Sequence, residues 1–189
     1  MVPNDAVLLN GQPVDLPLSV ETPYMNLAVE ERTAIDGLSE IWAFVETPPA
    51  FTVGLLSKGL DPGAQPTIVL YRKQRLATDP VIVKTPGGFD RPGQPMAGKI
   101  QHDTGIRIVA KGLISLGKVM GHATIRTPIR LFWTKDWDEV SRPREGVTVL
   151  NVPLIEAARM ALDGELEDDA SVQLVFKLYF LWRQGWLDI

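Results

Sequence analysis

Two residue types that often carry chemistry are scarce in this sequence of 189 residues, which has no cysteine and only two histidines. Without cysteine the chain can form no disulfide bond, no thiolate metal site and no cysteine nucleophile. The histidines, His102 and His122, lack the short spacings typical of zinc ligands, so we predict no metal and no cofactor. His102 next to Asp103 could still act as an acid–base pair.

The sequence also has few targeting signals. Its first residues lack the basic and apolar regions of a signal peptide, and no apolar run approaches the ~20 residues of a membrane span. We therefore predict a cytoplasmic or virion protein that makes no membrane contact. With 45% hydrophobic and 22% charged residues, the chain has the composition of a folded domain rather than a disordered one.

Charge of each sign is concentrated in different parts of the chain. Residues 1–66 contain two basic and nine acidic residues, residues 67–135 contain twelve and three, and residues 136–189 contain five and eleven. We predict that Arg107 and Lys111 share one strand face in the middle segment and that Arg126 and Arg130 share another. Such a basic sheet face would attract phosphates or an acidic protein surface. The alternative is a solvated face whose field is cancelled by the acidic ends of the same chain.

The order of elements predicts an α+β fold with a mostly antiparallel β-sheet, two main helices and an extended N-terminal arm. Prolines dominate residues 1–23, which we expect to form the arm, and residues 24–189 form one domain. Apolar residues at helical spacing predict helices over Tyr24–Asp36 and Leu154–Leu162. Runs of β-branched and aromatic residues predict strands over Glu40–Glu46, Phe51–Leu56, Thr67–Arg72, Val81–Lys84, Ile106–Lys111 and Ala123–Trp133. Alternating apolar residues predict a last, half-buried strand from Val172 to Trp182.

The segment from Thr85 to Gly98 is rich in turn-forming residues, namely Pro86, Gly87, Gly88, Pro92, Gly93 and Pro95. It offers little apolar area to offset the conformational entropy of ordering, roughly 1–2 kcal/mol per residue, so we predict a loop that is mobile in the free protein. Its end, from Gly93 to Lys99, matches the glycine and lysine positions of a phosphate-binding P-loop. Ile100 stands where that motif needs a serine or threonine, which favours a turn-rich loop instead.

Four short segments occur in the order known from one enzyme family: Asn26–Glu31, Pro48–Gly54, Thr85–Gly88 and Gly98–Ile100. Together they resemble pieces of the lipoate ligase and octanoyltransferase family. The resemblance implies a site for an acyl group or acyl-adenylate, with Lys99 as the lysine that holds it. The cysteine of the octanoyltransferases has no counterpart in this cysteine-free chain.

The remaining candidates are aromatic: Trp133 and Trp137 lie beside charged residues and are predicted interface residues. Because the sequence shows no catalytic constellation, we predict a non-catalytic assembly subunit, such as a tail, neck or connector ring of a phage-like particle. Its partners would be further copies of the chain or other assembly subunits, bound through the basic face and the apolar strands. The alternatives are a nucleic-acid-binding module that uses the basic face and a lipoate ligase-like enzyme.

Overall fold

The computed structural model describes residues 8–9, 12–13, 18–21, 25–33, 37–58, 65–74, 81–90, 93–120, 127–187 and 189. By internal contacts the chain forms two compact units. Unit 1 consists of residues 1–48 and 122–127, and unit 2 consists of residues 49–121 and 128–189. This division falls at Pro48, whereas the sequence suggested a boundary between an arm of residues 1–23 and a domain of residues 24–189.

The elements described in unit 1 are β-strands. The short strands β1 (Leu8–Leu9) and β2 (Gln12–Pro13) pair with each other, and β3 (Leu18–Glu21), β4 (Asn26–Thr33) and β5 (Ser39–Glu46) form an antiparallel sheet. The helix predicted over Tyr24–Asp36 is therefore wrong. All eight residues of β4 pair with β5, and this cross-strand pairing outweighs the weak helical spacing of a few apolar residues.

The centre of unit 2 is a mixed sheet, for which the described residues supply seven strands. Five of them follow the order β11-β12-β6-β7-β14, while β8 pairs with β7 and β9 pairs with β6. Strands β12 and β6 run parallel and the other neighbours run antiparallel. The bounds are β6 (Ala50–Ser57), β7 (Thr67–Gln74), β8 (Val81–Lys84), β9 (Gly87–Phe89), β11 (Ile114–Val119), β12 (Ile129–Thr134) and β14 (Val147–Pro153).

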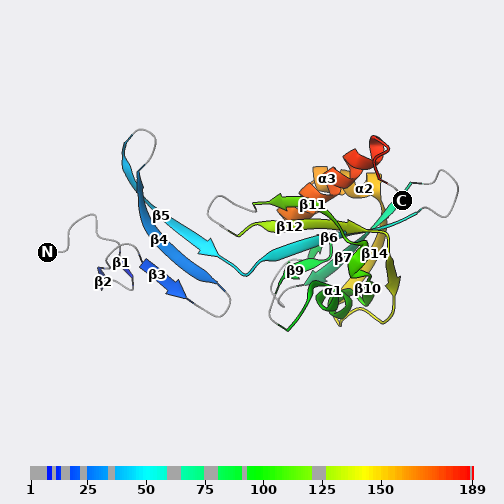
Figure 1. Cartoon of the computed structure of the whole chain (residues 1–189), viewed down its shortest axis with the longest axis horizontal. Coiled ribbons are helices and arrows are strands. Elements are labelled where there is room, and N and C mark those ends of the chain that lie inside the picture. Colours follow the sequence, from blue (N-terminus) through cyan, green and yellow to red (C-terminus); the bar gives the residue numbers. More distant parts are fainter. Residues whose placement is uncertain are drawn as a thin grey trace. The chain divides into compact units, whose positions relative to one another are not determined.

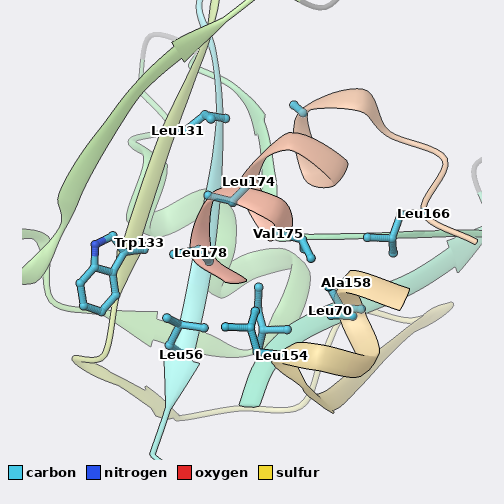
Figure 2. Close-up of a cluster of buried hydrophobic side chains, with 13 residues drawn as sticks. Leu56, Leu70, Leu131, Trp133, Leu154, Ala158, Leu166, Leu174, Val175 and Leu178 are labelled. Carbon is cyan, nitrogen blue, oxygen red and sulfur yellow. The ribbon is translucent and has the colours of Figure 1, made fainter. Parts of the chain in front are cut away.

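Helices cover both faces of this sheet (Figure 1). Helix α1 (Met96–Thr104) lies on one face, where Ile100 packs with Val53 and Val69 of the central strands. Helices α2 (Leu154–Leu162) and α3 (Asp169–Arg183) lie on the other face, and Figure 2 shows their buried leucines meeting those of β6, β7 and β12. A short antiparallel pair, β10 (Ile106–Ile108) and β13 (Trp137–Glu139), and a 3-10 turn (Ala110–Gly112) complete the unit.

Helix α3 replaces the long strand predicted over Val172–Trp182, so that prediction is wrong. Leu174, Val175 and Leu178 point into the core at helical spacing, and Asp168 caps the helix by accepting a hydrogen bond from Ser171 N at 3.1 Å. The alternation was misleading because this helix is apolar on several sides. Its outer aromatic residues contact one another, as in the edge-on pair of Phe180 and Trp186.

The α+β fold class is confirmed, with mostly antiparallel and mixed sheets and three α-helices in the described residues. Four predicted strands lie within β5, β6, β7 and β8, and the predicted helix Leu154–Leu162 coincides with α2. In the part of the chain that the structure describes, none of the helices has the length and apolar character needed to cross a membrane.

Candidate functional site

A cavity of about 490 Å³ opens in unit 2 beside helix α1. Strands β7, β8 and β9, helix α1 and the turn before β14 all contribute to its wall. The lining residues are mostly polar or charged, which is typical of a site for a charged ligand rather than an apolar one. They are Tyr71, Lys73, Gln74, Lys84, Gly87, Gly88, Phe89, Gln94, Lys99, Asp103, Arg144, Glu145, Gly146 and Val147.

The cavity exists because the two central strands diverge. Strands β6 and β7 pair only where Leu56 meets Ile68 and Ser57 meets Thr67. Beyond that point the segment from β8 to β9 bridges them, since β8 pairs with β7 and β9 pairs with β6. A Cβ atom on Gly87 would lie 2.5 Å from the backbone oxygen of Phe51, so the bridge can approach β6 this closely only with glycine there.

Helix α1 carries the central lysine of the site. Its start follows Pro95, whose carbonyl accepts a hydrogen bond from Lys99 N at 3.0 Å, and its end is capped by Gly105 in the left-handed conformation. The Lys99 side chain passes over Gly88, where an added Cβ would lie 3.3 Å from Lys99 Cε. The structure thus brings together Thr85–Gly88 and Gly98–Ile100, two segments that the sequence singled out.

Lys99, His102 and Asp103 form a charged cluster on α1. Lys99 Nζ donates to Asp103 Oδ2 at 2.5 Å, and His102 Nδ1 lies 2.9 Å from Asp103 Oδ1, so both carboxylate oxygens are occupied. Asp103 is only 5% exposed. Burial acts to raise the pKa of the Asp103 carboxyl, but the hydrogen bonds from Lys99 and His102 and the nearby positive charges lower it below its ordinary value.

Three further cationic side chains line the cavity from other elements. Lys73 on β7 lies over the ring of Tyr71, 5.7 Å from its centroid. Lys84 on β8 has its Nζ 4.0 Å from Asp168 Oδ2, and Arg144 donates its backbone N–H to the carbonyl of Asp103 at 3.3 Å. Together with Lys99 they still outnumber the nearby carboxylates when Asp168 is counted with the lining residues Asp103 and Glu145, so the cavity favours anions.

A buried chain of hydroxyl groups holds the bridging segment in place. Ser171 Oγ donates to Asp168 Oδ2 at 2.6 Å and accepts from Thr85 N at 3.0 Å. Thr85 Oγ1 lies 2.8 Å from Ser171 Oγ and 2.5 Å from Thr52 Oγ1. Thr52, Thr85 and Ser171 are all less than 4% exposed. The network therefore ties the residues before Gly87 to the N-terminus of α3.

The site does not match the requirements of a tightly bound divalent cation. Phosphoryl-transfer enzymes commonly neutralise phosphate charge with Mg²⁺ held by carboxylates. Nowhere in the described residues do three or more potential metal-ligating side chains gather. The buried carboxylate, Asp103, is already engaged by Lys99 and His102.

The predicted basic face is distributed over separate elements. Arg107 lies on β10 and pairs with Asp138 at 3.0 Å, while Arg130 lies on β12 and pairs with Asp90 at 2.6 Å. Lys111 lies in the 3-10 turn rather than on a strand face with Arg107, because β10 ends at Ile108. Arg126 is outside the described residues. Whether these residues bind a partner remains a prediction.

The aromatic candidates and the predicted loop have definite places in unit 2. Trp133 is 4% exposed in the core, and Trp137 donates its Nε1–H to the carbonyl of Leu56 at 2.9 Å. Much of the segment Thr85–Gly98 is regular, since Gly87–Phe89 is β9 and α1 begins at Met96; Pro86 precedes β9, and Gly93 and Pro95 precede α1. Pro92 is outside the described residues, and the predicted mobility of the segment remains a prediction.

No protein-family model and no curated protein match the sequence. The fold, however, is similar to that of a hydrolase of known structure. That structure is a crystal structure of an ADP compounds hydrolase, with a TM-score of 0.63 and 13% sequence identity. The similarity covers 93% of this chain and 100% of the other.

This similarity contradicts the prediction of a non-catalytic, phage-like assembly subunit, because the related fold is that of an enzyme. It also replaces the lipoate ligase resemblance, which rested on short segments, with a similarity over nearly the whole chain. The sequence did identify Gly88, Lys99 and Asp103, but it gave no indication that Lys73, Lys84 and Arg144 would join them. Their meeting depends on the pairing of β7 with β8 and β14.

Proposed function

We propose that the cavity around Lys99 binds the phosphate groups of an ADP compound and that the protein hydrolyses the phosphoanhydride bond of this ligand. The observation that carries the proposal is that four cationic residues, each from a different element, line one cavity whose wall also includes Gly87 and Gly88. The similarity of the fold to an ADP compounds hydrolase supports the same ligand class.

The reaction requires mainly positioning and charge stabilisation. A water oxygen forms a new bond to one phosphorus atom, and the bridging P–O bond to the other phosphate breaks. The bridging oxygen leaves with that phosphate, and the proton lost by the water is taken up by a base. With ADP-ribose as the substrate, the products are AMP and ribose 5-phosphate. Lys73, Lys84, Lys99 and Arg144 would stabilise the negative charge that develops on the phosphates.

Glu145 is the candidate base. It lines the cavity, is exposed, and makes no hydrogen bond or ion pair within the described part of the chain. Asp103 is less suited because both of its oxygens already accept hydrogen bonds and its pKa is lowered. Asp103 instead positions the Lys99 ammonium group.

The test is an assay with the purified full chain and ADP-ribose, in which AMP is quantified by anion-exchange chromatography. Lys99→Gln should lower kcat/KM by ~10²-fold or more, as the loss of a charge-stabilising donor does in other enzymes. Glu145→Gln should lower kcat by ~10²-fold or more with little change in substrate binding. Lys118→Gln, an exposed lysine on β11 away from the cavity, is the matched control and should behave like the wild type.

Two results would count against the proposal. If the wild type binds ADP-ribose but releases no AMP, the binding site stands and the hydrolase activity does not. If ADP-ribose does not bind, both parts are wrong. A cytoplasmic location, one of the two that we predicted, suits an enzyme that acts on nucleotide compounds. The predicted self-association remains to be tested by light scattering on the same preparation.

A further inference from the structure

We infer that this cavity takes the diphosphate as its metal-free anion, and that Mg²⁺ weakens binding instead of supporting it. The inference rests on the proposed function, since it concerns the charge state of the same ligand. It follows from the contacts of the Asp103 carboxylate, whose two oxygens already bind Lys99 and His102.

The first argument is the occupancy of that carboxylate. The Lys99 ammonium group lies 2.5 Å from Oδ2 and the His102 ring nitrogen lies 2.9 Å from Oδ1 of Asp103. A divalent cation would have to displace Lys99 from a side chain that is 7% exposed. The ammonium group therefore holds the place beside Asp103 that a metal ion would need, and it is itself a compact positive charge for a phosphate.

The second argument is the charge balance around the ligand. Lys73, Lys84, Lys99 and Arg144 line a cavity in which the described acidic residues are Asp103 and Glu145. A Mg²⁺ ion held at Glu145 would have one protein carboxylate and would share the cavity with these four cations. Mg²⁺ on the diphosphate also cancels two of the negative charges that the lysines attract.

The experiment measures the Kd of ADP by titration calorimetry in EDTA and in excess MgCl₂, at matched ionic strength. We expect binding to be about tenfold tighter in EDTA, which corresponds to about 1.4 kcal/mol. Equal affinity, or binding only with Mg²⁺, would overturn the inference and leave the proposed function intact. No binding of ADP in either buffer would overturn both.

A charge reversal provides the second arm. Lys99→Glu places a carboxylate one helical turn from Asp103, so ADP should bind more weakly in EDTA and Mg²⁺ should now restore binding. Lys99→Gln, which adds no carboxylate, should bind weakly in both buffers. Lys118→Glu makes the same change of charge outside the cavity and should keep the wild-type preference for EDTA. If Lys118→Glu reverses the preference as well, the effect reflects overall charge and the inference is wrong.

Circular dichroism and thermal unfolding of each variant provide the folding control. If Lys99→Glu does not fold, Lys99→Gln carries the comparison. Its loss of the preference for EDTA supports the role of the Lys99 ammonium group, and a retained tenfold preference contradicts it.

Discussion

Replacing Ser171 by alanine should destabilise unit 2 more than any change of a single exposed side chain. Ser171 Oγ takes part in three hydrogen bonds, to Thr85 N, to Thr85 Oγ1 and to Asp168 Oδ2. In Ser171→Ala the buried N–H of Thr85 loses its partner, which costs about 1–3 kcal/mol, and the two lost side-chain bonds add about 0.5–1.5 kcal/mol each. We expect a loss of about 3 kcal/mol in the free energy of unfolding.

Thr85→Val tests the same reasoning from the opposite side. Valine has nearly the shape of threonine, and the remaining groups keep partners, because Ser171 still bonds Asp168 and Thr85 N. Thr52 Oγ1 can still donate to the carbonyl of Pro86 at 3.3 Å. We therefore expect Thr85→Val to cost clearly less than Ser171→Ala, on the order of 1 kcal/mol.

Tryptophan fluorescence during urea unfolding is a suitable assay because four of the five tryptophans belong to unit 2. With a urea m-value of about 1–3 kcal/mol/M, a loss of 3 kcal/mol lowers the urea midpoint by about 1–3 M. Ser141→Ala, an exposed serine whose side chain lies outside the network, is the control. The reasoning fails if Ser171→Ala is no less stable than Ser141→Ala, or if Thr85→Val is the more damaging change.

Three further predictions concern the site and its surroundings. Gly87→Ala should destabilise the fold in chemical unfolding, because the added Cβ would lie 2.5 Å from a backbone oxygen. Gly88→Ala should leave chemical unfolding nearly unchanged but weaken ADP binding severalfold in calorimetry, because its Cβ would displace the Lys99 side chain. Because folding lowers the pKa of Asp103, the ionised carboxylate stabilises the fold fully above its ordinary pKa of 3.8, and this stabilisation is lost in more acidic solution. The free energy of unfolding should therefore differ between wild type and Lys99→Met at pH 7, and acid-unfolding curves should show this difference disappearing as the pH falls below about 3.8. Trp137→Phe removes the donor to a strand carbonyl and should cost about 1–2 kcal/mol in urea unfolding, and an unchanged midpoint would show that water replaces this bond.

Elements whose local pattern agrees with their surroundings were predictable from the sequence. Helix α2 has one apolar stripe, and β6, β7 and β8 are short β-branched runs between turn residues, so pattern and packing agree. Helix α1 was missed, although Pro95 before it and Gly105 after it are ordinary boundary signals. The glycines and prolines around it were interpreted as one continuous loop.

Long-range pairing decided the remaining elements. β4 is a strand because β5 pairs with it along its whole length. α3 is a helix because its buried side chains pack against the sheet and Asp168 caps its N-terminus. The same limit applies to the site. Lys99 and Asp103 are only four residues apart, but Lys73 and Arg144 are 71 residues apart and come together only through strand register.

The chain visits unit 1 twice, once through residues 1–48 and again through residues 122–127, between β11 and β12. In the second of these segments Thr127 is bonded to Thr47, because its Oγ1 accepts a hydrogen bond from Thr47 N at 3.0 Å and donates one to Thr47 O at 2.7 Å. The residue directly after β5 is therefore bonded to a residue just before β12, namely Thr127. A deletion that includes Thr47 would remove both of these hydrogen bonds of Thr127, and closing the connection between β11 and β12 would then carry a larger entropy cost.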